Sequence, residues 1–381
     1  MAHMQKQQEY ISQLDGLRAF AVALVVLFHW FPEGEGINVI ANGPVGVTLF
    51  FVLSGFLITR ILLANRNHLA THGLGATYKN FMFRRILRIF PLYYLTLLVI
   101  WCIQYIDFIP QVPSRLYDYP LYYLLYISNF LIEKLHDWSD VLSPFWSLAV
   151  EEQFYIIWPF VVLMVPQRFL KGTLIGTVVL GIASRGILGM MGYSDGVLMP
   201  TCLDAFGLGA IWAYVSYYDK SVEKFRKLLS ILALIGLAVF LYICFNNTDS
   251  WLKTLFFRTS ISLFCLYLVA GASYKKGFPS IFGKILDNGF MRHIGRISYG
   301  LYVYHMLVPT LVVPFIIKFL HRFLHITLTF SENSLKMVSL VVLILLATVS
   351  WYLFENPFIK LKKYFQLNRV KATPTSTVIS E

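Results

Sequence analysis

The segment LDGLRAFAVALVVLFHWF, residues 14–31, is the first long apolar run of the chain. It holds two ionisable residues, Arg18 and His29, although a charged side chain at the centre of a membrane helix costs about 2.5–3.5 kcal/mol. Eleven positions at 100° per residue place both side chains on one helix face, about 16 Å apart along the axis. We interpret this face as the wall of a cavity or of a ligand site.

The composition excludes a soluble domain. Of the 381 residues, 57% are hydrophobic and only 14% are charged, and the mean hydropathy is +0.64. Apolar runs of about 16–22 residues are long enough to cross a bilayer as helices. The sequence therefore predicts an all-α polytopic membrane bundle of about ten transmembrane helices. The expected spans are residues 14–31, 45–63, 89–108, 144–165, 173–191, 203–218, 228–245, 251–271, 297–320 and 335–354.

Basic residues in the loops predict how these helices are oriented. With ten spans and both termini in the cytoplasm, most lysines and arginines of the loops lie on the cytoplasmic side, as the positive-inside rule requires. The loops at residues 33–44 and 192–200, on the opposite side, contain none. An eleventh span over residues 117–132 would invert the later loops, so we expect this aromatic segment to be interfacial or re-entrant. The net charge of +12 is then a topological signal, and we expect no nucleic-acid partner.

We expect a single membrane domain over residues 5–360. Residues 1–4 are typical of an expression scar, and residues 361–381 form a basic and then polar cytoplasmic tail. The basic part of this tail is suited to anionic lipid headgroups, so the lipid bilayer is an expected partner. The chain has no Walker loop, H-E-x-x-H motif, C-x-x-C pair or dinucleotide fingerprint. We therefore expect no metal site, and neither an ATPase, a zinc protease nor an oxidoreductase.

Three arginines, Arg84, Arg85 and Arg88, lie within five residues just before an expected span begins. Arg85 and Arg88 are three residues apart and face the same way on a helix. The cluster is either a positive-inside anchor or a phosphate site, since planar guanidinium groups match phosphate oxygens. Because Arg18 lies at the same membrane face, we favour a site for the phosphates of a nucleotide or of coenzyme A.

Two adjacent acids, Glu151 and Glu152, lie near the start of another span, in the segment WSLAVEEQFY of residues 146–155. They either stabilise the positive end of the helix dipole or serve a site inside the membrane. Adjacent side chains point about 100° apart, so at most one of them faces the cavity. That carboxylate is expected to accept the ring N–H of His29 and form a His–carboxylate dyad. The sequence leaves the choice between the two acids open.

A further polar face lies in the segment SYGLYVYH, residues 298–305. Tyr299, Tyr302 and His305 recur every three residues and share one side of a helix. Intramembrane histidines are more often packed and hydrogen-bonded than catalytic, so we expect His305 to line the cavity. The expected substrate pocket combines side chains of this segment and of the preceding one. These are Trp146, Ser147, Glu152, Tyr155, Tyr302 and His305.

Two small residues, Ser54 and Gly55, interrupt the bulky segment FFVLSGFL of residues 50–57. Gly55 is expected to let a neighbouring helix approach closely. Ser54 lacks the G-x-S-x-G turn of a nucleophile elbow, so we do not expect it to act as a catalytic nucleophile.

Taken together, these segments resemble the acyltransferase 3 family of integral membrane acyltransferases along almost the whole chain. Five motifs occur in the order of that family: LDGLR with a histidine eleven residues after its arginine, FFVLSGF, RRILRIFP, WSLAVEEQFY and ISYGLYVYH. The resemblance implies a ten-helix enzyme that takes an acyl group from cytoplasmic acyl-CoA. It passes this group to a hydroxyl of a sugar, a cell-wall polymer, an antibiotic or another acceptor.

The resemblance also implies roles for individual residues. Arg18 and His29 match the Arg-x10-His motif of the family, Arg85 and Arg88 match its Arg-x-x-Arg motif, and Glu151 matches the acid of its Trp-Ser-Leu segment. The chain departs from the family at one position. Many members carry an arginine before the aspartate of the segment TCLD, residues 201–204, where this chain has Cys202.

By this resemblance acyl-CoA, most simply acetyl-CoA, is the donor substrate, and Arg18, Arg85 and Arg88 bind its phosphates. His29 acts as the general base for the acceptor hydroxyl, since the pKa of a histidine lies near neutrality. Direct transfer of this kind needs no metal. His29 falls near the outer end of its span, so we expect donor and acceptor to enter from opposite sides. The expected location is the plasma membrane of a bacterium.

Two alternatives stay open at this point. A proton-coupled transporter of a small solute also keeps buried His, Arg and Glu, but it usually shows broken helices in paired repeats, which this sequence lacks. A different membrane-bound O-acyltransferase fold would share the reaction but carry its key histidine late in the chain. His305 is the only candidate for that position.

Overall fold

The computed structural model describes residues 10–40, 42–194, 196–218, 221–246 and 251–365. Over these ranges the chain is helical, without a β-strand. The expectations for residues 1–4 and 366–381 lie outside the described residues. The long helices are α1 (Ser12–Trp30), α2 (Asn42–Asn65), α3 (Leu69–Ile103), α6 (Phe145–Met164), α7 (Gln167–Met190), α8 (Leu203–Tyr218), α9 (Val222–Asn246), α10 (Trp251–Ser273) and α15 (Glu332–Ser350). The shorter ones are α4 (Pro120–Leu124), α5 (Ser128–Leu135), α11 (Ile281–Leu286), α12 (Gly289–Arg296), α13 (Ser298–Tyr304), α14 (Val313–Leu324) and α16 (Asn356–Lys360).

Seven helical stretches of the described chain are long and apolar enough to cross a membrane, or eight if one bent pair forms a single span. Each apolar run predicted from the sequence overlaps a helix. The lower count arises because α2 and α3 form one stretch, Asn42–Ile103, and because α8 has only 16 residues. The prediction of an all-helical polytopic membrane protein is confirmed. The number ten and the cytoplasmic position of both termini stay predictions.

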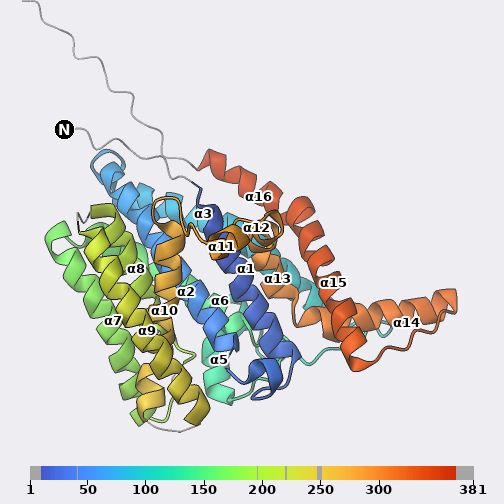
Figure 1. Ribbon diagram of the computed structural model, residues 1–381. Helices are drawn as coiled ribbons and strands as arrows, with labels where there is room; N and C mark the ends of the chain where they lie inside the picture. Colours follow the sequence, from blue (N-terminus) through green and yellow to red (C-terminus); the bar gives the residue numbers. More distant parts are fainter. Residues whose placement is uncertain (1–9, 41, 195, 219–220, 247–250, 366–381) are drawn as a thin grey trace, which may run out of the picture.

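Helix α2 lies at the centre of the bundle and packs on α1, α6, α8 and α10 (Figure 1). Its contact with α8 is very close. A Cβ atom at Gly55 would lie 2.1 Å from the carbonyl oxygen of Phe206, and one at Gly209 would lie 2.1 Å from the carbonyl oxygen of Val52. Glycine at both positions therefore lets the two backbones touch, and the expectation for Gly55 is confirmed.

The aromatic segment 117–132 does not form a membrane span. It is divided between α4 and α5, and Tyr126 between them has a φ of 55°. Helices of five and eight residues are too short to cross a bilayer. This agrees with the expectation that the segment is interfacial or re-entrant.

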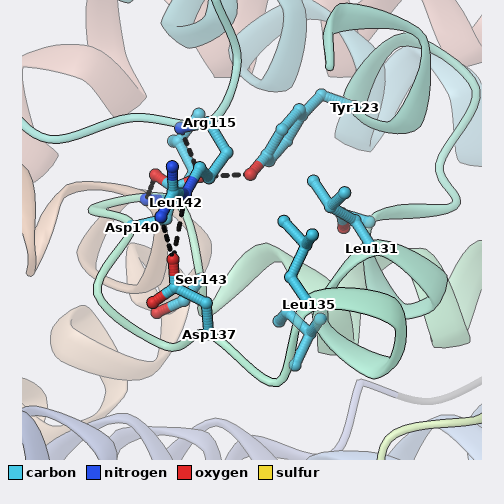
Figure 2. A pocket seen from close by; sticks show the side chains of 10 residues that line it. Arg115, Tyr123, Leu131, Leu135, Asp137, Asp140, Leu142 and Ser143 are labelled. Atoms are coloured by element: carbon cyan, nitrogen blue, oxygen red, sulfur yellow. Dashed lines mark hydrogen bonds and ion pairs between the residues drawn. The ribbon is translucent and has the colours of Figure 1, made fainter. Parts of the chain in front are cut away.

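Polar contacts fix the chain around this segment (Figure 2). Arg115 forms an ion pair with Asp137, and the hydroxyl of Tyr123 donates to Asp140. Hydrogen bonds from Ser139 and Arg115 lower the pKa of Asp137 to about 2. The cavity enclosed here measures about 10 Å³, which is the space of roughly one water molecule. We therefore assign these contacts to folding and not to substrate binding.

The apolar run 297–320 is bent and not one straight helix. Residues 298–304 and 308–324 meet at 51°, and a π-helical turn, Val308–Val312, precedes α14. Pro309 within this turn has no backbone N–H to continue an α-helical ladder. Helix α14 then extends away from the bundle (Figure 1). His305 lies directly before the bend, as the C-cap of α13, and such irregular turns are common at functional sites.

Candidate active site

A cavity of about 200 Å³ lies inside the bundle, between α1, α2, α3, α6 and α13. Seven of the eleven residues that the sequence assigns to the site line it, and they come from four helices. They are Arg18, Arg85, Arg88, Ser147, Glu151, Tyr155 and Tyr302. The other four do not line the cavity, and they are His29, Trp146, Glu152 and His305.

Arg85 and Arg88 of α3 bring positive charge to this cavity without a direct ion pair. Within the described parts of the chain, neither guanidinium makes a hydrogen bond or an ion pair, and the Nε atom of Arg85 is buried without a partner. Arg18 differs because it pairs with Asp15, three residues earlier on α1. Unpaired guanidiniums in a cavity wall are suited to hold an anion such as phosphate.

Glu151 organises the middle of the cavity wall. Its Oε1 accepts from the hydroxyl of Ser54 at 2.9 Å, and its Oε2 accepts from the hydroxyl of Tyr155 at 2.9 Å. The two hydroxyl oxygens are 3.1 Å apart. The sequence predicted no role for Ser54. The spacing of Glu151 and Tyr155, one helical turn apart, indicated only that one hydroxyl group lies near this acid.

Glu152 does not line the cavity and is buried, and its Oε1 has no hydrogen-bond partner within the described chain. Of the two adjacent acids, Glu151 is therefore the one that faces the cavity. Neither carboxylate is hydrogen-bonded to His29 in this structure. The expected His–carboxylate dyad is thus not formed here, because the Nδ1 of His29 is bonded to the carbonyl oxygen of Val25.

His29 is paired instead with a second imidazole, that of His305. The two ring centroids are 4.8 Å apart, at an interplanar angle of 61°. The Nδ1 of His29 lies 2.8 Å from the carbonyl oxygen of Val25, and the Nδ1 of His305 lies 2.6 Å from that of Tyr302. A carbonyl oxygen only accepts, so each Nδ1 carries the proton in neutral rings and each Nε2 keeps a free lone pair. The Nε2 of His305 is buried without a partner in the described chain.

Tyr302 lies between the cavity and this histidine pair. Its ring lines the cavity and also packs against His305, with the centroids 5.5 Å apart. Its hydroxyl donates to the carbonyl oxygen of Pro144 at 2.9 Å and lies 2.6 Å from the hydroxyl of Ser147. The cavity and the two histidines are therefore adjacent, and one fixed side chain is in contact with both.

Trp146 is near the site but does not belong to the cavity wall. Its ring packs edge-on against Phe51, with centroids 6.1 Å apart, and against Trp138, with centroids 6.3 Å apart. Its contacts are with other aromatic side chains. In the residues that the structure describes, no three His, Cys, Asp or Glu side chains form a group that could hold a metal ion.

Comparison with known proteins identifies the family of the chain. A family model described as an acyltransferase domain matches residues 11–355. The chain belongs to the acyltransferase 3 family. The resemblance inferred from the five motifs is confirmed, and the match favours this family over the other membrane-bound O-acyltransferase fold. The limits of a domain over residues 5–360 stay a prediction.

Three relatives of this acyltransferase 3 protein are named for O-acetyl transfer. The peptidoglycan O-acetyltransferase OatA of Listeria monocytogenes is 30% identical over 81% of this chain and 50% of its own length. OatA of Staphylococcus aureus, an O-acetyltransferase, is 27% identical over 78% of this chain and 50% of its own length. Bacillus subtilis YrhL, provisionally named a peptidoglycan O-acetyltransferase, is 28% identical over 100% of this chain and 61% of its own length. The chain thus spans about half to three fifths of these relatives, and no solved structure matches it.

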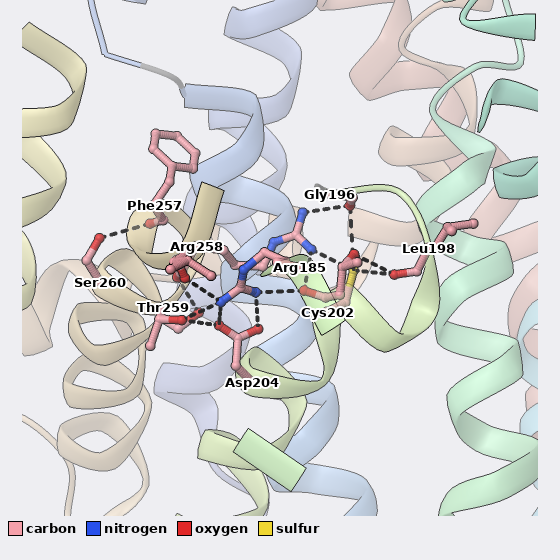
Figure 3. Close-up of polar contacts among 12 residues, drawn as sticks. Arg185, Gly196, Leu198, Cys202, Asp204, Phe257, Arg258, Thr259 and Ser260 are labelled. Carbon is pink, nitrogen blue, oxygen red and sulfur yellow. Dashed lines mark hydrogen bonds and ion pairs between the residues drawn. The ribbon is translucent and has the colours of Figure 1, made fainter. Parts of the chain in front are cut away.

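A second polar cluster of this family member lies between α7, α8 and α10 (Figure 3). Arg185 forms two 2.9 Å hydrogen bonds with the carboxylate of Asp204, and Thr259 donates to the same carboxylate at 2.6 Å. Arg258 of α10 contacts the sulfur of Cys202 and the carbonyl oxygen of Gly196. Arg258 thus reaches Cys202, the position at which this chain departs from the family. This cluster was not predicted from the sequence.

Proposed function

We propose that this family member is a membrane O-acyltransferase that moves an acyl group, most simply acetyl, from acyl-CoA to a hydroxyl of a glycan. The observation that carries the proposal is the cavity, because it joins the unpaired guanidiniums of Arg85 and Arg88 to Tyr302, which contacts the histidine pair. The names of the relatives support acetyl as the group and a glycan such as peptidoglycan as the acceptor. Neither the family match nor these names support the transporter alternative.

In this proposal Arg85 and Arg88, together with Arg18, bind the phosphates of acyl-CoA. The residues fit that ligand, since the two guanidiniums of α3 make no direct ion pair in the described chain and the buried Nε of Arg85 lacks an acceptor. Acyl-CoA supplies a thioester carbonyl, the carbon that the acceptor hydroxyl attacks. The arginine end of the cavity faces the cytoplasm, in keeping with the predicted orientation of the helices.

Glu151 prepares the wall along which the donor arm lies. The carboxylate accepts hydrogen bonds from the hydroxyl groups of Ser54 and Tyr155. The lone pairs of the two hydroxyl oxygens therefore stay free to accept from other donors. The pantetheine arm of coenzyme A contains amide N–H groups, which are donors of that kind. Glu151 is then a positioning residue, and its effect on transfer passes through the two hydroxyl groups.

His29 acts as the general base. Its Nδ1–H is held by the carbonyl oxygen of Val25, so the Nε2 lone pair is free to accept the proton of the acceptor hydroxyl. The resulting imidazolium returns that proton to the departing thiolate, and no proton is left over. His305 lies beside it with its own Nε2 proton-free, and so it can accept a hydrogen bond from the imidazolium. His305 thus takes the role of hydrogen-bond acceptor for the imidazolium of His29, which was expected of a carboxylate.

The donor and the acceptor enter from opposite sides of the membrane in this proposal. Arg18 and His29 lie at the two ends of one helix face, with about 16 Å of helix rise between them. The donor arm extends from the arginines toward Tyr302, and the acceptor hydroxyl reaches His29 from the outer side. The membrane concerned is the plasma membrane of a bacterium.

The experiment that tests this function uses the purified protein in lipid nanodiscs, with labelled acetyl-CoA and glycan acceptors. We expect acceptor-dependent thiol release and label on the acceptor, and a loss of about 10²–10⁴-fold in the rate for H29A. His321, an exposed residue on α14, provides the control H321A, which should retain the wild-type rate. Wild-type rates in H29A, or no release with any glycan, would overturn the proposal.

A further inference from the structure

We propose that Lys362, which lies beyond the matched acyltransferase domain, completes the cation cluster that binds the phosphates of the nucleotide donor. The inference rests on the proposed function and adds a specificity-determining residue to it. The family match ends at residue 355, so the motifs of the family give no role to this lysine. Its role follows from how the end of the chain folds back on α3.

Two aromatic and polar contacts hold the end of the described chain against α3. After α16 a short 3₁₀ helix, Leu361–Tyr364, is followed by Phe365. The ring of Phe365 stacks on Phe83, with centroids 5.0 Å apart and planes at 19°, and the Nδ2 of Asn80 donates to the carbonyl oxygen of Phe365. Asn80 and Phe83 belong to the same turns of α3 as the arginine cluster. The fold therefore places Lys362 beside that cluster.

The ammonium group of Lys362 adds a further positive charge to this cluster. It is half-buried, and it interacts electrostatically with Arg84, Arg85 and Arg88. In the described chain no carboxylate lies within ion-pair distance of these four cations. The acid nearest in sequence, Glu355, is buried and accepts from the hydroxyl of Ser350 at 3.2 Å. Glu355 attracts Arg88 electrostatically, but it does not contact any of the four cations. Like charges that are held together with no carboxylate in direct contact repel one another, and a bound polyanion offsets that repulsion.

The neighbouring lysine shows that this placement is specific. Lys363 is exposed, and its ammonium group lies over the ring of Tyr364, 4.9 Å from the centroid. Lys362 is instead half-buried and interacts electrostatically with the three arginines of α3. The two lysines carry the same charge at adjacent positions, but they differ in exposure. This difference provides a matched control.

Phosphate at this cluster has two sources, the nucleotide part of coenzyme A and the headgroups of anionic lipids. The position of Lys362 favours the nucleotide, because Arg85 and Arg88 beside it also line the cavity. A lipid-binding role is better suited to side chains that face outward, such as Lys363. The proposal therefore predicts selectivity for coenzyme A over a thiol that lacks the nucleotide.

The test measures binding of coenzyme A and of pantetheine, by calorimetry, to protein in nanodiscs of neutral lipid. We expect K362Q to weaken coenzyme A binding about tenfold or more, as for loss of one charge-assisted contact, and to leave pantetheine binding unchanged. K363Q should bind both ligands as the wild type does, and K362R should restore most of the affinity. With acetyl-CoA, the KM of K362Q should rise while kcat is retained.

Three outcomes would overturn the role of Lys362. These are equal coenzyme A affinities for K362Q and K363Q, equal losses for coenzyme A and pantetheine, or an effect of K362Q confined to association with anionic vesicles. If the wild-type protein binds no coenzyme A at all, the proposed function fails. If the wild type binds it and K362Q binds it equally well, the inference alone fails.

Discussion

Two groups of charged side chains lie inside this membrane bundle, and they differ in how they are satisfied. In the closed cluster of α7, α8 and α10, Arg185 and Asp204 are 1% and 0% exposed. The guanidinium nitrogens Nη1 and Nη2 of Arg185 are occupied by the carboxylate, by Thr259 and by backbone carbonyl oxygens. In the open cluster of α3, Arg85 and Arg88 lack hydrogen-bond partners in the described chain and line a cavity of about 200 Å³.

The difference distinguishes the proposed ligand site from an ion pair that holds helices together. In the closed cluster the two charges contact each other directly, although the Nε of Arg185, like that of Arg85, is buried without a partner in the described chain. The chief effect of such a bonded ion pair is to fix how the helices meet. An unpaired pair of guanidiniums is unfavourable until an anion arrives. Charge inside the membrane is therefore not sufficient to identify a functional site. The decisive feature is charge left without a partner beside open space.

Breaking the closed cluster should have the largest effect on stability. In D204A the charge of Arg185 stays buried without its partner, and we expect a destabilisation of about 3–5 kcal/mol, seen as a lower Tm of the purified protein. The double variant R185M/D204L removes both charges and should recover part of the loss. The surface pair of Lys336 and Glu332 serves as the control, because E332Q should leave the Tm nearly unchanged. A D204A protein with wild-type Tm but no coenzyme A binding would contradict the comparison.

Changing the open cluster should affect binding and not stability. For R88Q we expect coenzyme A binding weaker by about 10–100-fold and a Tm that is unchanged or higher, since one of several like charges is removed. Calorimetry and thermal unfolding of the same preparation measure both quantities. Lys79, an exposed residue of the same helix, provides the control K79Q. A fall in Tm comparable to that of D204A would show that Arg88 is also structural.

The sequence pointed to the arginines that line the cavity, whose role in binding stays a prediction, and it did not point to the closed cluster. Arg18, Arg85 and Arg88 were identified because guanidiniums at short helical spacings are visible in the sequence itself. Arg185 belongs to α7 and Asp204 to α8. Their pairing depends on the conformation of the loop between these helices, which residue types alone do not indicate. Hydropathy gave the helices for a physical reason, since a bilayer forces the backbone to satisfy its own hydrogen bonds. It did not give the bend before Pro309, because a π-helical turn leaves the apolar pattern unchanged.

The partners of His29 could not be predicted for a similar reason. The sequence analysis gave its ring N–H to a carboxylate, but the carbonyl oxygen of Val25, one turn earlier, already accepts from Nδ1. Every residue has a backbone carbonyl group, so the residue types do not indicate which carbonyl accepts a hydrogen bond from a side chain. The approach of His305 depends on the bend that follows α13, which was not foreseen.

Glu151 shares one property with each cluster. Its carboxylate oxygens accept hydrogen bonds, as in the closed cluster, but it lines the cavity, as the open cluster does. If it supports Ser54 and Tyr155 as proposed, E151Q keeps an acceptor for only one of the two hydroxyls, and kcat/KM should fall roughly tenfold, the loss of about one charge-assisted hydrogen bond. S54A, which removes one of these hydroxyls, should cost less, about three- to tenfold, with the Tm retained.

The comparison with H29A distinguishes this support from direct catalysis. A carboxylate that oriented or stabilised the imidazolium of His29 would make E151Q nearly as inactive as H29A, whatever the state of Ser54. Values of kcat/KM for acetyl-CoA, measured for E151Q, S54A and the double variant, separate the two cases. If Glu151 acts through the hydroxyl of Ser54, the double variant should lose less than the product of the single losses, since the two side chains share one hydrogen bond. A loss in the double variant equal to the product of the single losses, together with an E151Q activity as low as that of H29A, would contradict this role. Glu151 would then act directly on His29, as was expected from the sequence.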